Sequence, residues 1–177
     1  MQTTEQWWDK VSNNSGEMLV WLGDQFYGEQ TAAIRVRNLL TEYPEITEPE
    51  RKLITMIADD EAKHAGWILN LLLARGFTSF GLTRDKPDRY WDKTLPTEPV
   101  TFSQICAIGH HAEVMRLDRI RLLAEDVRFN DIAETFAKIL SDEVFHAKAF
   151  ACMSSPEDIE AARGNHDAGR QALGLVA

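Results

Sequence analysis

The sequence is poor in cysteine. Its 177 residues contain only Cys106 and Cys152, which do not form a Cys-x-x-Cys pair. A disulfide framework, a zinc knuckle and an iron–sulfur site all need more cysteines or a closer spacing, so the sequence argues against all three. We interpret both cysteines as small buried apolar residues.

The sequence also lacks long apolar runs and an excess of positive charge. Residues 1–10 contain no basic segment followed by an apolar run, so no secretory signal is expected. No apolar stretch approaches the roughly 20 residues that span a bilayer, and we expect a cytoplasmic protein that does not enter a membrane. The net charge of −9 argues against a general nucleic-acid surface.

Helical periodicity is the main pattern that is present. Apolar residues recur at spacings of three and four in four long segments, which predicts four amphipathic helices. These helices are expected at about residues 17–42, 47–75, 101–127 and 131–153. The predicted fold is therefore all-α, with two helix hairpins that pair into a four-helix bundle.

The two hairpins are joined by residues 76–101. This segment contains three prolines and shows no clear periodicity, so we expect a long crossover. We expect a single domain over residues 1–177, with a core bundle of about residues 17–153.

Both ends of the chain are expected to add short helices. Thr3 and Gln6 have the spacing of a helix N-terminus. Residues 155–177 are expected to form a helical tail that breaks up around Gly164 and Gly169, because glycine weakens a helix interior.

One five-residue pattern, Asp-Glu-x-x-His, occurs twice, at residues 60–64 and 142–146. Each copy has a lone glutamate on the preceding predicted helix, Glu29 for the first copy and Glu113 for the second. At about 1.5 Å per residue, Glu29 lies roughly 21 Å from the end of its helix, and Glu61 lies roughly 18 Å from the start of the next. The spacing therefore places each lone glutamate level with the motif on the neighbouring antiparallel helix.

Together these residues supply four carboxylates and two imidazoles. All six lie on stripes that are otherwise apolar, and burying four carboxylates without cations costs many kcal/mol. Glu and His at positions i and i+3 point to the same helix face, so one carboxylate and one imidazole can bind the same metal. The pattern is that of a two-metal site inside a helix bundle. The predicted metal ligands are Glu29, Glu61, His64, Glu113, Glu143 and His146.

The motif glutamates Glu61 and Glu143 are placed to bridge the two metals, which makes them the predicted catalytic carboxylates. His110 lies one helical turn before Glu113 on the same face. It is a candidate for an extra ligand, for a proton donor near the site, or for a histidine whose hydrogen bonds are satisfied within the core.

Asp60 and Asp142 each precede a motif glutamate. A metal-bound histidine usually donates its second ring N–H to a carboxylate. We therefore predict that Asp60 accepts from His146 and that Asp142 accepts from His64, across the bundle. The alternative is that both aspartates face solvent.

The sequence resembles the ferritin-like superfamily of diiron-carboxylate proteins over about residues 17–153. The segment most similar to rubrerythrin-type domains runs from Glu113 through Leu123-Ala124-Glu125, Asp131-Ile132-Ala133 and Phe136 to Glu143 and His146. The resemblance implies a four-helix bundle with one long crossover and two iron ions held by the six predicted ligands. A manganese pair or a mixed Mn/Fe pair is also compatible with such a carboxylate-rich set.

Two features depart from rubrerythrins. Those proteins often carry a rubredoxin domain with paired Cys-x-x-Cys, which this chain lacks, and they tend to have an additional glutamate where this chain has Arg116. The second departure argues against peroxidase activity of that type. The Asp-Glu-x-x-His form in both halves is more similar to diiron oxygenases and desaturases, including bacterial hydroxylases of modified tRNA, which usually have longer chains.

The preferred hypothesis is a non-haem diiron oxidase, oxygenase or hydroxylase that activates O₂ and oxidises an unidentified small molecule. Turnover would need an electron-donor protein. The alternative is an iron-handling protein: a ferroxidase, an iron store or a peroxide scavenger. A third hypothesis is an interaction module with a structural metal.

The chain is expected to form a homodimer. Nucleic acid is not an expected partner, although modified tRNA stays open as a substrate. The aromatic candidates to line a substrate cavity, or to pack in the core, are Trp21, Phe26, Trp67 and Phe145.

Overall fold

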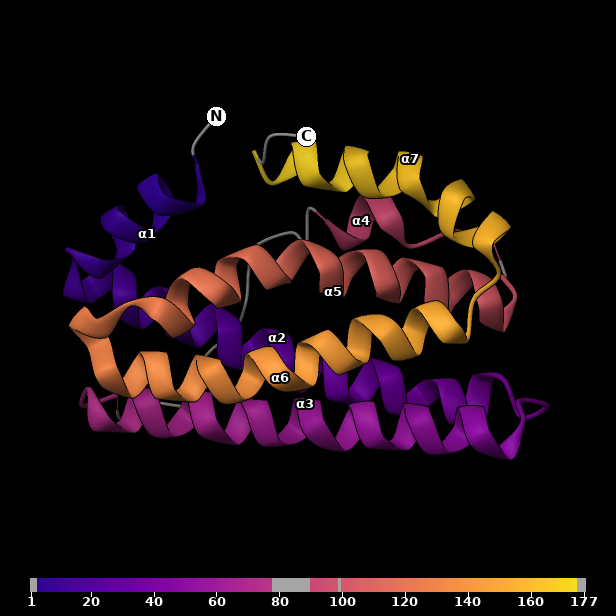
Figure 1. The fold of residues 1–177 in the computed structure, drawn as a ribbon, viewed down its shortest axis with the longest axis horizontal. Coiled ribbons are helices and arrows are strands. Elements are labelled where there is room, and N and C mark those ends of the chain that lie inside the picture. Colours follow the sequence, from indigo (N-terminus) through magenta and orange to yellow (C-terminus); the bar gives the residue numbers. More distant parts are fainter. Residues whose placement is uncertain (1–2, 78–89, 99, 175–177) are drawn as a thin grey trace.

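The structure, a computed structural model, describes residues 3–77, 90–98 and 100–174. The regular elements in those ranges are all helices. They are α1 (Thr4–Ser12), α2 (Ser15–Glu42), α3 (Glu48–Ala74), α4 (Trp91–Thr94), α5 (Phe102–Glu125), the 3₁₀ helix η1 (Val127–Phe129), α6 (Asn130–Cys152) and α7 (Pro156–Ala172). The four long helices α2, α3, α5 and α6 lie side by side, which confirms the predicted all-α bundle (Figure 1).

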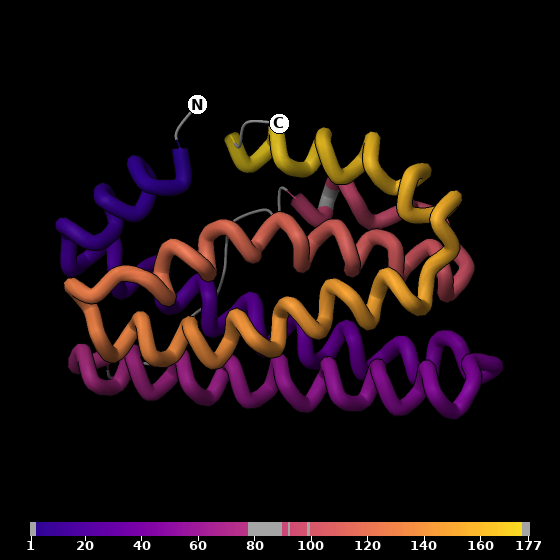
Figure 2. The backbone as a smooth tube through the Cα atoms, in the orientation of Figure 1, coloured from indigo at the N-terminus to yellow at the C-terminus, as the bar shows by residue number. Residues whose placement is uncertain are grey.

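The bundle consists of two antiparallel hairpins. α2 packs along α3, and α5 packs along α6 (Figure 2). Among contacts between the hairpins, those of α3 with α6 are the most extensive, whereas the backbones of α2 and α5 approach each other at few points or none. One side of the bundle is therefore closed by direct helix packing, and the α2–α5 side is wider.

The core is divided into two apolar clusters at opposite ends of the bundle. One contains Leu22, Ile68, Ile120 and Phe136, and the other contains Val36, Ile57, Cys106 and Phe150. Each cluster draws at least one residue from every long helix. On each of these helices the segment between the two clusters carries the predicted metal ligands. An apolar layer therefore closes the bundle on either side of those residues.

The short N-terminal helix α1 begins with the predicted cap. The Thr3 hydroxyl accepts from the backbone N–H of Gln6, and the Gln6 side chain accepts from the backbone N–H of Thr3. Trp8 is 1% exposed and packs at the same end of the core as Leu22. Its indole N–H donates to Asp126 at 2.5 Å, which fastens α1 to the turn after α5.

The C-terminal helix α7 corrects one prediction. It continues through Gly164 and Gly169 without a break. A Cβ at Gly169 would lie 2.7 Å from Cδ2 of Tyr90, so this glycine permits the close approach of α4 to α7. The predicted crossover contains α4, and its residues 78–89 and 99 lie outside the described ranges.

The two cysteines differ in their surroundings. Cys106 is buried, as predicted, whereas Cys152 is exposed because it ends α6 at the bundle surface. No helix in the described part of the chain has both the length and the apolar character needed to cross a membrane.

Candidate metal centre

The four long helices bring all six predicted ligands together at the middle of the bundle. Glu29 lies on α2, Glu61 and His64 lie on α3, and Glu113 lies on α5. Glu143 and His146 complete the set from α6. Glu113 is 7% exposed and the other five are between 0% and 1% exposed. Charged side chains are rarely buried this deeply unless they are paired or bind a metal.

The six side chains form two overlapping groups, each able to hold one metal ion. The first contains Glu29, Glu61, His64 and Glu143, and the second contains Glu61, Glu113, Glu143 and His146. Within each group, one ligand atom from every residue lies within 4.8 Å of the others. Glu61 and Glu143 belong to both groups, which is the arrangement expected of carboxylates that bridge two metals.

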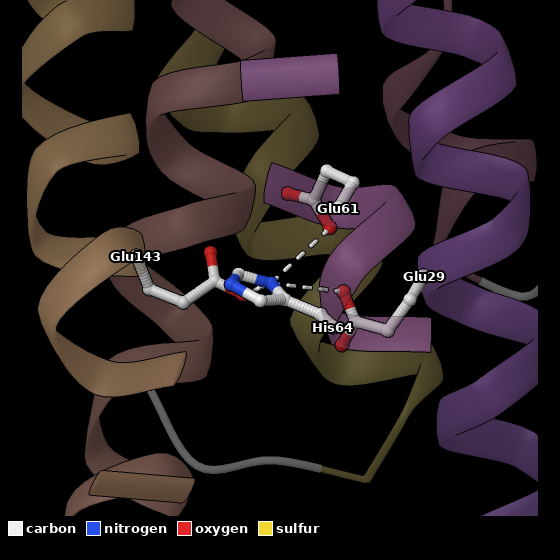
Figure 3. Close-up of side chains that lie close together, drawn as sticks. All are labelled: Glu29, Glu61, His64 and Glu143. Carbon is white, nitrogen blue, oxygen red and sulfur yellow. Dashed lines mark ion pairs between the residues drawn. The ribbon is translucent and has the colours of Figure 1, made fainter. Parts of the chain in front are cut away.

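The first group is arranged around the inner nitrogen of His64 (Figure 3). His64 Nδ1 lies 3.7 Å from Glu29 Oε2, 3.9 Å from Glu61 Oε2 and 3.8 Å from Glu143 Oε1. These distances are too long for hydrogen bonds. They match the roughly 3 to 4 Å between neighbouring ligand atoms that each lie about 2 Å from a shared ion.

The second group lies around the inner nitrogen of His146. Its Nδ1 lies 3.2 Å from Glu61 Oε1 and 3.4 Å from Glu143 Oε2. The rings of His64 and His146 have centroids 5.8 Å apart. The Nδ1 atoms of both histidines lie within 3.9 Å of Glu61 and Glu143, so the two rings face the same pair of carboxylates.

The fit of these residues to metal ions can be tested by their hydrogen bonds. Eight buried side-chain nitrogen or oxygen atoms of the six candidate ligands lack a hydrogen bond in the described ranges. They include both oxygens of Glu61, both oxygens of Glu143 and the Nδ1 atoms of the two histidines. Buried polar atoms are seldom left without partners in folded proteins. Carboxylate oxygens and imidazole nitrogens are ligands that divalent iron and manganese accept, so the donor set fits two such ions.

The outer nitrogens of the two histidines contact aspartates of the opposite hairpin. His64 Nε2 lies 3.2 Å from Asp142 Oδ2, and His146 Nε2 lies 3.4 Å from Asp60 Oδ2. These are the pairs that the repeated motif predicts. A hydrogen bond from Nε2–H to the aspartate leaves the lone pair of Nδ1 directed toward the carboxylates, as a metal ligand requires.

Arg116 of α5 adds a positive charge to the cluster. Its guanidinium forms ion pairs with Glu29 and, at 3.2 Å, with Glu143 Oε1. It also lies 3.7 Å from Glu113 Oε2, one turn earlier on the same helix. In the sequence, Arg116 stood out only as a departure from the rubrerythrin pattern. Its spacing of three residues from Glu113 is the signal that could have placed it in the site.

The four carboxyl groups differ in their pKa values. Burial raises the pKa of Glu61 and of Glu113 well above the usual range, and the neighbouring carboxylates raise both further. Burial is also the largest influence on Glu29 and Glu143 and acts in the same direction. The Arg116 guanidinium and hydrogen bonds with neighbouring side chains together outweigh it, so the pKa values of both carboxyl groups are lowered. Metal ions bind the ionised carboxylates, so loading the cluster is expected to release protons.

His110 lies outside both metal groups. Its Nδ1 is 2.9 Å from the backbone carbonyl of Ala147 on α6, so its hydrogen bond is made to the helix backbone. His111 and His166, which the sequence did not connect, stack with ring centroids 4.8 Å apart. His166 also hydrogen-bonds to Tyr90 at 2.8 Å, which links α7 to α4.

A cavity of about 400 Å³ lies on the wide side of the bundle, between α2 and α5. Glu29, Glu113 and Arg116 form part of its wall, so it reaches the candidate metal centre. Among the aromatic residues proposed from the sequence, Trp21 lines this cavity. Trp67 and Phe145 instead contact the rings of His64 and His146, and Phe26 packs against the apolar core.

Comparison with curated proteins and with solved structures gives no match. The Rubrerythrin family model matches residues 22–154, about three quarters of the chain. The match begins in α2, ends just after α6 and includes all six candidate ligands. The chain therefore belongs to the rubrerythrin family, within the ferritin-like superfamily of diiron-carboxylate proteins.

Proposed function

We propose that the chain is a non-haem dinuclear iron oxidoreductase that activates O₂ inside the bundle and oxidises a small organic substrate. The observation that carries the proposal is a cluster of ligand atoms without hydrogen bonds, reached through the α2–α5 cavity at Glu29 and Glu113. A cavity of about 400 Å³ is in the size range of sites for small organic molecules. Such a cavity favours oxidation of a substrate over storage of iron.

The glutamates and histidines of the repeated motif have proposed roles. Glu61 and Glu143 would bridge the metals, because both belong to the two groups. His64 and His146 would each bind one metal through Nδ1. Two ferrous ions would supply electrons for the reduction of O₂. The apolar clusters on either side of the ligands close the bundle along its axis, so water and substrate would reach the centre through the α2–α5 cavity.

Iron handling is the second candidate function. Membership of the rubrerythrin family favours ferroxidase or peroxide chemistry. The ion pair of Arg116 with Glu29 places a cation where rubrerythrins tend to have a further glutamate, which argues against the peroxidase reaction. We therefore rank substrate oxidation first.

The test is O₂ consumption by protein loaded with ferrous iron in the absence of oxygen. With NADPH, a ferredoxin and its reductase as electron donor, we expect sustained O₂ uptake above the protein-free background, and Glu61→Ala should abolish it. Size-exclusion chromatography and iron analysis of the same samples test the alternative. Uptake of iron far beyond two ions per chain, in a large cage-like oligomer, would support storage and overturn the proposal. Faster turnover of hydrogen peroxide than of O₂ would also overturn it.

A further inference from the structure

The α2–α5 cavity combines aromatic walls with arginine side chains. Trp7, Trp21, Tyr90 and Trp91 contribute aromatic surface from three different elements. Three arginines from the described part of the chain also line the cavity: Arg35 of α2, and Arg116 and Arg119 of α5. Aromatic walls with a few placed charges are typical of sites that bind a small molecule in one orientation.

Arg119 is the least compensated of these charges. It is half-buried, and no ion pair joins it to any residue in the part of the chain that the structure describes. Its guanidinium makes a cation–π contact with Trp7: the guanidinium carbon lies 4.8 Å from the centroid of the ring. Burial lowers the pKa of Arg119, which reflects the cost of removing this cation from water without a carboxylate partner. An anion in the cavity would offset that cost.

Arg116 lies on the same face of α5, one turn nearer to the metal ligands. Its ion pairs in the structure are with Glu29, Glu113 and Glu143, all candidate ligands. If these carboxylates bind two divalent cations, the four glutamates of the cluster are already neutralised. The Arg116 side chain, 27% exposed, then presents a second positive charge to the cavity.

The other charged groups in the cavity wall do not cancel the positive charge of Arg116 and Arg119. Within residues 3–77, 90–98 and 100–174, the acidic residues that line the cavity are Asp24, Glu29 and Glu113. When Glu29 and Glu113 bind metals, Asp24 is the one acidic residue of the described cavity wall that still opposes the positive charges of Arg116 and Arg119. Arg35 is not counted in this balance. A net positive, partly enclosed cavity disfavours cations and favours anions.

We propose that this cavity binds a small organic acid, with an aromatic or apolar body against the tryptophans and its carboxylate against Arg119 and Arg116. The inference rests on the proposed function, because it names the substrate class of the same site. A molecule held in this way would lie beside Arg116, which contacts Glu29 and Glu113, and would therefore reach the edge of the candidate metal centre. Arginine suits the task because its planar guanidinium can donate two hydrogen bonds to one carboxylate.

Gly28 of α2 offers a way to block the cavity without changing a ligand. It lines the cavity, and a Cβ built on it meets no other atom within 4 Å. Gly28→Leu therefore adds a side chain at the wall while the helix backbone is preserved. Gly66→Leu is the matched control, because Gly66 lies mid-helix in α3, is exposed and has equally open surroundings.

The test compares phenylacetate with phenylacetamide, two probes of similar size that differ in charge. Their binding to the full chain, loaded with ferrous iron under argon, is measured by calorimetry and by the fluorescence of the cavity tryptophans. We expect phenylacetate to bind about tenfold more tightly than the amide, the effect of about one charged hydrogen bond. Arg119→Gln should remove most of this preference. Arg121→Gln should retain it, because Arg121 pairs with Asp118 on the exposed face of α5. Gly28→Leu should weaken the binding of both probes, and Gly66→Leu should leave the binding of both unchanged.

Equal affinity for the two probes, no binding of phenylacetate in the millimolar range, or an unchanged preference in Arg119→Gln would each overturn the inference. Bound iron is counted in the same samples. Failure to bind iron refutes the proposed function, whereas normal iron binding without a preference for phenylacetate refutes only the substrate class.

Discussion

The two sides of the candidate metal centre are built differently. On the α3–α6 side, His64 and His146 are 0% exposed and each contacts an aspartate of the opposite hairpin. On the α2–α5 side, Glu29 and Glu113 lie in the wall of a cavity, beside a cation that is 27% exposed. One side is fixed by direct helix packing, and the other is reached from outside the bundle.

The difference suggests that one side of the site holds the metals and the other side admits O₂ and the substrate. Ligands on the closed side would hold the metals in place, because their orientation is set by contacts across the bundle. Ligands on the open side would face O₂ and the substrate, because the cavity gives access to them. Variants on the two sides should therefore affect different measurements.

The largest effect is expected from the closed side. Glu61→Ala removes a carboxylate that belongs to both metal groups, so we expect loss of both irons. Binding is measured by anaerobic titration with ferrous iron, with circular dichroism to verify that the helices remain. Glu134→Ala, on an exposed position of α6, is the control and should bind iron normally. Two irons retained by Glu61→Ala would show that this glutamate is not a shared ligand.

A smaller effect is expected from Asp142→Ala, which leaves every ligand in place. Loss of the contact with His64 Nε2 should lower metal affinity by roughly 10- to 100-fold, because the aspartate fixes the orientation of the ring. Competition with a metal chelator measures the affinity. Asp118→Ala, an exposed aspartate of α5, serves as the control. Unchanged affinity in Asp142→Ala would assign this aspartate to the solvated surface.

On the open side, Arg116→Gln should change stability and metal affinity in opposite directions. Without metal, the variant should be less stable by about 2 kcal/mol, a value reduced from that of fully buried pairs because Arg116 is 27% exposed. Metal should bind more tightly, since a nearby cation has been removed. Thermal unfolding with and without metal measures both effects. A loss of stability that metal binding leaves unchanged would contradict the proposed charge balance.

The smallest effect is expected at the cover of the open side, where α7 packs on α5 and α4. Burial lowers the pKa of His166 to about 4, with the charges of His111 and Arg170 acting in the same direction. Between about pH 6.5 and pH 4 the unfolded chain binds a proton that the folded chain does not, so stability falls as the pH drops through this window. The groups around His166 are Tyr90, His111, Arg163, Asp167 and Arg170.

Hydrogen exchange measures this effect locally. Exchange of α7 amides should rise as the pH falls through the window, relative to the exchange expected from the intrinsic pH dependence. His166→Asn, which cannot titrate, should flatten the dependence. A pH dependence equal in the two proteins would place the sensitivity elsewhere.

The closed side could be predicted from the sequence in detail. Asp-Glu-x-x-His occurs twice, and helix geometry fixes the direction of residues three apart, so the pairing of Asp142 with His64 followed from symmetry. The bundle was equally predictable, because its helices carry strong apolar periodicity. The distances around His64 Nδ1 then place the candidate ligands in the arrangement that the motif implied.

The open side could not be predicted in the same way. Its cavity depends on α2 and α5 lying apart and on α4 and α7 covering the gap, which are tertiary contacts without a local sequence signal. The prediction for Gly169 was wrong for this reason: glycine weakens a helix locally, but here it allows close packing against Tyr90. Arg116 was noticed only as a departure from relatives, although its spacing from Glu113 placed it on the inner face.

The central claim is that six side chains form one site for two metals. The most direct test is an anaerobic titration of the full chain with ferrous iron, followed by bound iron per chain and by the midpoint of thermal unfolding. We predict saturation at about two irons per chain and a rise in the midpoint, because the bound cations neutralise buried carboxylates. Saturation at one iron or none, or binding of two irons without a rise in the midpoint, would contradict the claim.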